Sequence, residues 1–349
     1  MKIVVATGGT GGHIFPALQA ACVLRDRGHE VIFAGALGLV EEKIKAEGFR
    51  AIPIKAGGLT RKSLTGLADF SFLMLKAIRR SIEVLKQTQP DKVIGFGGYG
   101  SFPIVLSARL FNIPTMIHEQ NVMPGKANRL LAKLVKKVAI SFLETQNYLN
   151  PDKTVLTGCP CHHQSPSQSR ENLFRKFSLK TDRPTILVLG GSQGSHKINE
   201  VFFDMIASWG KNVPVQAIHM TGTKDYSFYA IKYKDGFLPV KEFEFIDPIE
   251  EAYGIADVVI ARAGAATVSE LGFFALPCIL VPYPLADGHQ KYNADVLVKA
   301  GLAKMIEQKD LTVEGLTSTV RSLLGEKKEH KPLFTNNPAH ELALAVESL

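Results

Sequence analysis

KIVVATGGTGGH, residues 2–13, and TILVLGGSQGS, residues 185–195, follow one pattern, and that pattern decides the fold class. Each stretch is an apolar strand that runs into a glycine cluster and then into a helical segment. A strand enters a helix in this way in doubly wound α/β domains. The pattern occurs once in each half of a chain of 349 residues, which is long enough for two cores, so we expect two such domains.

Short β-rich segments alternate with helical segments along the whole chain. They lie near residues 3–6, 30–34, 51–54, 92–96, 114–118, 137–141 and 153–156 in the first half, and near 185–189, 214–219, 242–246, 257–261, 278–282 and 303–306 in the second. Strands separated by helices pair in parallel through right-handed crossovers. The sequence therefore predicts an α/β protein with two doubly wound, Rossmann-like domains facing a central cleft, where ligands bind beyond the carboxyl ends of the strands.

Local composition suggests where the domains begin and end. The segment TGCPCHHQSPSQS, residues 157–169, has the Pro, Ser and Gly content of a linker. We therefore place the first domain at residues 1–158 and the second at 159–337. Near the end of the chain, Asn337 is expected to cap a last helix over 338–349, with Pro338 at its first position.

The overall composition is that of a soluble globular protein, with 46% hydrophobic and 21% charged residues. No run of about eighteen apolar residues occurs, so no transmembrane helix is expected. The N-terminal residues lack the apolar core and cleavage site of a signal peptide, which favours the cytoplasm. Four cysteines in such a chain are expected to be reduced thiols.

The net charge of +8 is unevenly distributed. Residues 1–160 carry 21 basic and 11 acidic side chains, whereas the remainder carries 20 and 22. Such asymmetry indicates that the first half meets an anionic partner, either a nucleic acid or a membrane surface.

Two segments of the first half favour the membrane. As a helix, residues 64–86 have an apolar arc wider than the roughly 100° stripe of a core-facing helix, and Phe72 projects among Lys76, Arg79 and Arg80. Residues 126–137 add further cations and no acidic residue. Apolar side chains ringed by cations suit peripheral attachment to an anionic leaflet, although a buried helix with a basic rim is the alternative. Nucleic acid is disfavoured because no aromatic residues are interleaved with the basic ones.

Three glycine loops, at residues 8–12, 97–100 and 190–194, are expected at the carboxyl ends of strands. Glycine lets a backbone approach a ligand closely, and a helix N-terminus that follows favours phosphate. A tight turn without a ligand is the alternative for any single loop, but three in one chain favour a phosphate-bearing ligand. None of them fits the dinucleotide fingerprint or the P-loop, so a nicotinamide dehydrogenase and a P-loop NTPase are both disfavoured.

Seven motifs occur in the order and spacing of one family. They are GGTGGHIFPAL at 8–18, FGGYGS at 96–101, HEQN at 118–121, GGSQGS at 190–195, FID at 245–247, ARAGAATVSE at 261–270 and DGHQKYNA at 287–294. Over nearly its whole length the chain resembles the MurG family of N-acetylglucosaminyltransferases, within glycosyltransferase family 28. The last helix of that family packs back onto the first domain.

The resemblance implies a GT-B fold and an inverting transfer of GlcNAc. The donor would be UDP-GlcNAc, and the acceptor would be the 4-hydroxyl of MurNAc in lipid I, undecaprenyl-diphosphoryl-MurNAc-pentapeptide. The product would be the β-1,4-linked lipid II of peptidoglycan synthesis, made at the cytoplasmic face of the cell membrane. Cell wall biogenesis, cell shape and cell division would depend on it.

The second half is expected to bind the donor. Ser192 lies where a strand-to-helix turn would bring its hydroxyl and nearby N–H groups against the diphosphate, so no metal ion is obligatory, although a divalent cation could stimulate the reaction. The T-x-x-E spacing of Thr267 and Glu270 predicts a helix capping box, whereas the resemblance gives Glu270 the ribose hydroxyls. It further implies that Ile246 lies against the uracil and that Gln290 binds the sugar hydroxyls.

The first half is expected to supply the base that takes the proton of the acceptor hydroxyl. His13 follows the first glycine loop at the start of a helix, and an imidazole transfers protons near neutral pH, although a helix-capping role is the alternative. Glu119 is a second candidate base, but HEQN could equally be a strand end held by polar side chains. The full set of substrate contacts implied by the resemblance is Thr10, Gly11, Gly12, Tyr99, Asn121, Ser192, Ile246, Ala265, Ala266, Thr267, Val268, Ser269, Glu270 and Gln290.

One segment departs from the family pattern. Where the family has T-G-N-P-x-R, this chain has Cys159, Cys161, His162 and His163, so the arginine that would help to hold the donor is His162. The cluster C-x-C-H-H lacks the spaced pairs of a structural zinc site, and no metal site is predicted.

Two other function classes fit the architecture. A UDP-sugar epimerase would bind the same donor without needing a basic, lipid-facing surface. A non-catalytic sugar-nucleotide sensor would bind the donor without turnover. Acceptor-dependent release of UDP separates both from a transferase.

Overall fold

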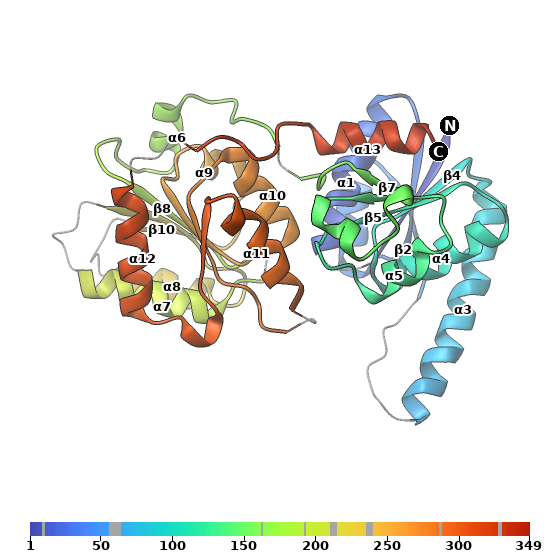
Figure 1. Ribbon diagram of the computed structural model, residues 1–349, viewed down its shortest axis with the longest axis horizontal. Helices are drawn as coiled ribbons and strands as arrows, with labels where there is room; N and C mark the ends of the chain where they lie inside the picture. Colours follow the sequence, from blue (N-terminus) through green and yellow to red (C-terminus); the bar gives the residue numbers. More distant parts are fainter. Residues whose placement is uncertain are drawn as a thin grey trace. The chain divides into compact units, whose positions relative to one another are not determined.

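The computed structural model describes residues 1–8, 11–55, 64–161, 163–191, 193–209, 215–234, 240–285, 288–326 and 330–349, with the backbone alone for 39 and 64–70. The chain divides into two compact units (Figure 1). Unit 1 comprises Met1–Cys161 and Asn336–Leu349, and unit 2 comprises residues 162–335. Unit 1 first ends at Cys161, three residues after the boundary placed from the sequence at 158. Unit 2 ends at residue 335, two residues before the boundary placed at 337.

Unit 1 is built from strands that alternate with helices. Its elements are β1 (Lys2–Gly8), α1 (Gly11–Asp26), β2 (Glu30–Ala36), η1 (Gly38–Val40), α2 (Glu41–Ala46), β3 (Arg50–Pro53), α3 (Leu64–Thr88), β4 (Lys92–Gly95), α4 (Gly98–Leu110), β5 (Thr115–Glu119), α5 (Lys126–Ala132), β6 (Lys137–Ile140), η2 (Leu143–Asn147), η3 (Pro151–Lys153), β7 (Thr154–Leu156) and α13 (Pro338–Glu347). Every β-rich segment expected in this half overlaps one of these strands.

The described strands of unit 1 form one parallel sheet in the order β3-β2-β1-β4-β5-β6-β7. β1 pairs with β2 through Lys2↔Glu30 to Gly8↔Ala36, and with β4 through Ile3↔Lys92 to Ala6↔Gly95. The chain reverses its direction of travel across the sheet between β1 and β4. Ligands bind at such a switch point, beyond the carboxyl ends of the strands.

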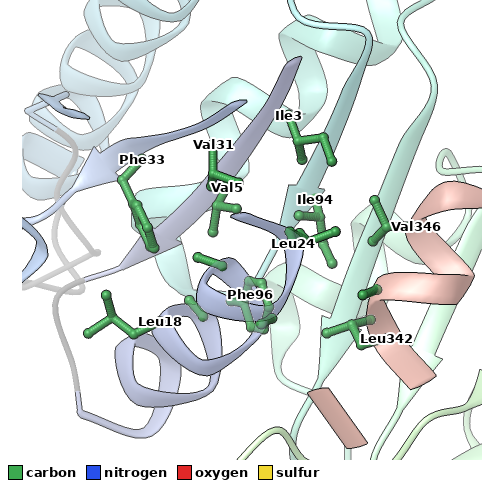
Figure 2. Packing of buried hydrophobic residues seen from close by; sticks show 14 of the residues in the cluster. Ile3, Val5, Leu18, Leu24, Val31, Phe33, Ile94, Phe96, Leu342 and Val346 are labelled. Carbon is green, nitrogen blue, oxygen red and sulfur yellow. The ribbon is translucent and has the colours of Figure 1, made fainter. Parts of the chain in front are cut away.

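The last helix, α13, belongs to the core of unit 1. Its Leu342 and Val346 are buried beside Ile94 and Leu24, as Figure 2 shows. Asn337 caps the helix by accepting from the N–H of His340, with a proline at the first turn, so the predicted cap is confirmed. Burial of each large apolar side chain contributes about 1.5–3 kcal/mol, so α13 stabilises unit 1 substantially.

Charged groups hold the far end of α13 on the same unit. The carboxylate of Glu347 accepts two hydrogen bonds of 2.7 Å from Arg27 and lies 2.8 Å from Nε2 of His29. Lys92 donates to the carbonyl oxygens of Val346 and Glu347 at 3.0 and 2.7 Å. These contacts join residues more than 250 positions apart in the sequence.

Unit 2 repeats the same construction. Its elements are α6 (Arg170–Lys176), β8 (Thr185–Leu189), α7 (His196–Trp209), β9 (Gln216–Met220), α8 (Tyr226–Tyr233), β10 (Val240–Phe243), α9 (Glu250–Tyr253), β11 (Val258–Ala261), α10 (Ala265–Phe274), β12 (Cys278–Leu280), α11 (His289–Lys299), β13 (Ala303–Met305), η6 (Gln308–Asp310) and α12 (Val313–Gly325). Its described strands are parallel in the order β10-β9-β8-β11-β12-β13, which confirms the α/β class for both units.

β10 begins earlier than the sequence suggested. It spans Val240–Phe243 and pairs with β9 from Val240↔Ala217 to Phe243↔Met220, whereas residues 242–246 were expected. Val240 is buried, while Phe245 is 45% exposed. The prediction, which followed the apolar residues of 242–246, therefore placed the strand about two residues too late.

α3 is the longest described helix of unit 1 and packs against α4. Its first turns extend beyond the sheet of that unit in Figure 1. Among the helices that the structure describes, none combines the length and the hydropathy needed to span a bilayer.

Candidate active site

In unit 1 two glycine loops pack against each other at the carboxyl ends of the adjacent strands β1 and β4. A Cβ atom built on Gly8 would lie 3.5 Å from the backbone nitrogen of Gly100, and one on Gly100 would lie 2.8 Å from the Cα of Gly8. A Cβ on Gly35 would lie only 2.2 Å from the carbonyl oxygen of Thr7. These glycines are needed for close packing of the loops, and this role is separate from contact with a ligand.

His13, the predicted base, is the third residue of α1, and its ring lies against the second glycine loop. A Cβ atom on Gly97 would lie 3.3 Å from Cδ2 and Nε2 of His13, and one on Gly98 would lie 3.5 Å from Cε1. The ring is partly buried, and burial lowers the pKa of His13 to about 4. His13 is therefore neutral at pH 7, which is the form that accepts a proton.

Glu119, the second candidate base, is buried at the end of β5 and held by four N–H donors. One carboxylate oxygen accepts from the backbone and side-chain nitrogens of Asn121 at 2.9 and 3.3 Å. The other accepts from the backbone of Gly125 at 3.1 Å and from Asn128 Nδ2 at 2.8 Å. Burial raises the pKa of Glu119, and these hydrogen bonds oppose the rise. The geometry supports the interpretation of HEQN as a strand end held by polar groups.

The other contacts predicted in unit 1 lie near His13 in sequence or in structure. Gly11 and Gly12 begin α1, Gly12 is exposed, and a Cβ atom on Gly12 would meet none of the described residues within 4 Å. Tyr99 is the second residue of α4 and is 42% exposed. Asn121 is partly buried through its bonds to Glu119. Thr10 lies outside the described residues.

In unit 2 the third glycine loop packs on the loop after β9. A Cβ atom on Gly194 would lie 2.1 Å from the carbonyl oxygen of Thr221, and one on Gly222 would lie 2.2 Å from the nitrogen of Gly194. A Cβ on Gly191 would meet none of the described residues within 4 Å. Ser192 lies outside the described residues, and its contact with the diphosphate stays a prediction.

The capping box expected from Thr267 and Glu270 is wrong. α10 begins at Ala265, and its N-cap is Gly264, which has an extended backbone and no capping side chain. Thr267 is therefore the third residue of the helix, not its cap. α10 begins four residues after β11 ends, so its N-terminus lies at the carboxyl edge of the sheet, where the positive end of a helix favours anionic ligands.

Two residues of α10 that were predicted to contact the donor have side chains buried within unit 2. The side chains of Val268 and Ser269 are 0% and 1% exposed, and the N–H of Val268 donates to the carbonyl of Gly264 at 2.9 Å. These two side chains therefore pack inside the unit, and the contact of Val268 and Ser269 with the donor stays a prediction. Ala266 and Thr267, in the first turn, are only partly buried.

Glu270, the predicted partner of the ribose, is held by a tyrosine of α9. The hydroxyl of Tyr253 donates to Oε2 of Glu270 over 2.9 Å, and both residues are buried. Ile246 follows β10 and is also buried, as is Ala265 at the start of α10. Their contacts with the ribose and uracil remain predictions.

Gln290, predicted to bind the sugar, is the second residue of α11. Its Oε1 accepts a 2.9 Å hydrogen bond from the backbone N–H of Tyr283. The neighbouring Asn293 is buried and donates to the carbonyl of Ala263 at 3.2 Å, which ties α11 to the loop before α10. The side-chain oxygen of Gln290 is thus held by a hydrogen bond within unit 2, which orients the amide.

Three residues that hold these groups were missed by sequence reasoning. Asn128 is buried and donates to Glu119 and to the carbonyl of His118, at 2.8 and 3.2 Å. Tyr253 holds Glu270, and Arg262 binds the loop after β12. No local motif marks Asn128 or Tyr253. Arg262 directly follows a buried strand, and that position was a usable signal.

The cysteine- and histidine-rich segment is largely packed. Cys159 and Cys161 are buried free thiols, and Sγ of Cys161 donates to the carbonyl of Cys159 at 3.2 Å. The ring of His163 stacks on Phe273 with centroids 4.8 Å apart. His162 lies outside the described residues. Within the part of the chain that is described, no group of three or more His, Cys, Asp or Glu side chains could hold a metal ion.

The residues predicted to face a membrane lie on the exposed side of α3. Phe72 is 58% exposed, and Nζ of Lys76 lies 4.2 Å from the centre of its ring. Arg79 and Arg80 are also exposed, and each pairs with Glu83. α3 therefore carries an exposed aromatic ring in contact with Lys76, and two exposed arginines farther along the same helix.

Two family models match the chain, the glycosyltransferase family 28 N-terminal domain over residues 3–140 and the C-terminal domain over residues 185–349. The chain belongs to glycosyltransferase family 28. A family 28 relative from Thermodesulfovibrio yellowstonii is 38% identical over 339 residues, which cover 95% of this chain and 92% of the relative. That protein is named UDP-N-acetylglucosamine–N-acetylmuramyl-(pentapeptide) pyrophosphoryl-undecaprenol N-acetylglucosamine transferase.

Solved structures agree with membership of family 28. The crystal structure of Acinetobacter baumannii MurG matches with a TM-score of 0.76 and 28% identity, covering 100% of this chain and 99% of that one. A UDP-GlcNAc 2-epimerase from Methanocaldococcus jannaschii matches with a TM-score of 0.67 at 15% identity, covering 100% and 99%. The second likeness is one of fold alone. The fold class is GT-B, with two Rossmann-like domains.

Proposed function

We propose that this chain transfers GlcNAc from UDP-GlcNAc to the 4-hydroxyl of MurNAc in lipid I, which yields lipid II for peptidoglycan synthesis. The observation that carries this proposal is the 36% to 39% identity to transferases of that name over 93% to 98% of the chain. The glycine loops and the polar residues at the carboxyl edges of both sheets support it.

Unit 2 binds the donor in this proposal. The N-terminus of α10 and the glycine loop after β8 present N–H groups to the diphosphate and stabilise negative charge as UDP leaves. Glu270, fixed by Tyr253, accepts hydrogen bonds from the ribose, and Ile246 lies against the uracil. Gln290 donates to hydroxyls of the sugar. Because N–H groups and helix N-termini can stabilise this charge, no metal ion is obligatory, although a divalent cation can assist.

Unit 1 supplies the base. The 4-hydroxyl oxygen of MurNAc attacks C1 of the GlcNAc unit, the bond from C1 to the phosphate oxygen breaks, and the hydroxyl proton passes to neutral His13. Attack opposite the leaving group inverts the configuration at C1 and gives the β-1,4 linkage. The exposed backbone of Gly12, with Gly11, Tyr99 and Asn121, contacts the substrates near the reacting carbon.

Unit 1 also binds the cytoplasmic face of the cell membrane in this proposal. Phe72, Leu73 and Leu75 are 58%, 43% and 66% exposed on α3 beside Lys76, Arg79 and Arg80. On and after α5, four cations are exposed near Leu130 and Leu134: Lys126, Arg129, Lys133 and Lys136. Each cation near an anionic leaflet contributes about 1 kcal/mol, and the exposed apolar side chains among these cations favour a membrane surface over nucleic acid.

The experiment that tests transfer against epimerisation and simple binding measures UDP release with and without lipid I. A transferase releases UDP only when lipid I is present, and it leaves UDP-GlcNAc unchanged in its absence. Release or epimerisation without an acceptor would contradict the proposal. Binding of UDP-GlcNAc with no turnover under any condition would indicate a sensor instead.

A further inference from the structure

Arg262 joins three loops at the carboxyl edge of the unit 2 sheet. It follows β11 directly, and its Nη1 donates to the carbonyls of Val281 and Pro282, after β12, at 3.1 and 3.3 Å. Its Nη2 donates to Oε1 of Gln308, after β13. Its guanidinium also lies over the ring of Tyr283, with Cζ 5.5 Å from the centroid. The planar guanidinium group of Arg262 therefore fixes the turn at residues 281–283.

The same turn orients Gln290. The backbone N–H of Tyr283 donates to Oε1 of Gln290 at 2.9 Å. Arg262 binds the two carbonyls that immediately precede Tyr283 in the chain, so its position sets the direction of that N–H. Gln290 is 28 residues from Arg262 in sequence, and the turn at residues 281–283 connects them in space.

We infer that Arg262 is a positioning residue for recognition of the donor sugar, acting through the turn at 281–283 on Gln290. This inference rests on the proposed function, in which Gln290 contacts the sugar of UDP-GlcNAc. Because Oε1 of Gln290 is used by Tyr283, the side chain presents N–H donors to the sugar hydroxyls. Without the guanidinium contacts of Arg262, the side-chain amide of Gln290 is free to rotate, and its hydrogen bonds to the sugar weaken. The UDP contacts on α10 keep their geometry.

The test compares the affinities of UDP-GlcNAc and UDP for the full chain by isothermal titration calorimetry. R262K retains the charge but cannot bind both carbonyls and Gln308 in one plane. We expect R262K to weaken UDP-GlcNAc binding by about 10-fold, the cost of a lost neutral hydrogen bond, and to change UDP binding by less than about twofold. Q308L, which removes one partner of Arg262, should act in the same direction more weakly.

A matched control lies at the other end of the same strand. Arg170 donates to the carbonyl of Gly254 at 3.0 Å and to Asp257 at 3.2 Å, just before β11. R170K breaks the same kind of contact at the amino edge of the sheet. It should leave the ratio of UDP-GlcNAc to UDP affinity unchanged.

A double-mutant cycle separates positioning from general support of the fold. In a Q290A background, R262K should change UDP-GlcNAc binding by less than about twofold, because the group it orients is gone. The inference would be overturned if R262K weakened the binding of UDP and of UDP-GlcNAc equally. It would also be overturned if the fold-changes in Kd caused by R262K and Q290A multiplied in the double mutant. Failure of the wild-type chain to bind UDP-GlcNAc at all would instead overturn the proposed function and the inference with it.

Discussion

The hydroxyl of Tyr253 donates a 2.9 Å hydrogen bond to Oε2 of Glu270, and both side chains are buried. This bond fixes a carboxylate at the side of unit 2 where the nucleotide is proposed to bind. A fixed carboxylate is well suited to accept hydrogen bonds from two vicinal hydroxyls of a ribose.

Removing that carboxylate should weaken nucleotide binding. We expect E270A to raise the Kd of UDP by about 10- to 100-fold, the range for a hydrogen bond to a charged group, and Y253F to raise it by a smaller factor. Y233F is the control, because the hydroxyl of Tyr233 also makes a partly buried hydrogen bond in unit 2, with His219 at 2.7 Å. If E270A binds UDP like the wild type, Glu270 serves only as a structural partner of Tyr253.

The role of His13 is tested by removing the imidazole. H13Q should lower kcat by about 10²- to 10⁴-fold, the usual contribution of a general base, with the affinity for UDP-GlcNAc changed little. Steady-state transfer kinetics and donor titrations give both quantities. A kcat within about threefold of the wild type would assign the base to another group.

The pH dependence of kcat/KM reports the ionisation of the free enzyme. Burial lowers the pKa of His13 to about 4, so the imidazole remains a proton acceptor well below pH 6.5. Activity should hold as the pH falls through 6 and be lost as it approaches about 4. An acid limb centred near pH 6.5 would show that His13 ionises as an exposed histidine does. Circular dichroism at each pH is the control for unfolding.

The bond between Glu347 and Arg27 should make the docking of α13 sensitive to acid. The hydrogen bond from Arg27, and then that from His29, lower the pKa of Glu347 to about 2. A lowered folded-state pKa contributes stability that is present above the ordinary value of 4.5 and is lost as the pH falls toward 2.

E347Q should therefore lower the free energy of unfolding by about 1 kcal/mol at pH 7, measured by calorimetry, with a smaller difference from the wild type at pH 3. E41Q, which breaks the exposed pair of Glu41 and Lys45, is the control and should cost less. A difference between E347Q and the wild type that stays constant down to pH 3 would be inconsistent with this pairing.

Membrane attachment through α3 is tested with vesicles. Neutralising Lys76, Arg79 and Arg80 to Gln should reduce binding to vesicles containing phosphatidylglycerol by about 10- to 100-fold, since each cation contributes about 1 kcal/mol. The same neutralisation of the exposed Lys299, Lys304 and Lys309 of unit 2 is the control with equal change in charge. Equal losses in the two variants would refute a specific surface on unit 1.

The sequence predicted most of the fold because the relevant signals are local. An apolar strand, a glycine cluster and a helix follow one another within about twelve residues, and both sheets have the expected parallel strands. T-x-x-E at Thr267 was misread because the spacing fits a cap, whereas the N-cap is Gly264, three residues earlier. The burial of Val268 and Ser269 could not be read from a motif.

Contacts between distant segments explain the remaining differences. Whether Glu119 is a base or a structural carboxylate depends on donors from Gly125 and Asn128, which only the folded chain brings to it. The link from Arg262 to Gln290 likewise depends on the pairing of β11 with β12. These contacts follow from the order of strands in the sheet, which the sequence does not specify residue by residue.

The central claim is transfer of GlcNAc to a lipid-linked acceptor, and the most direct measurement follows labelled GlcNAc from its UDP donor into lipid I. The account predicts label in a lipid-extractable disaccharide product. The rate of labelling should fall strongly in H13Q, and labelled UDP-GalNAc should give no such product. No label in the lipid fraction, with UDP-GlcNAc bound and lipid I present, would contradict it.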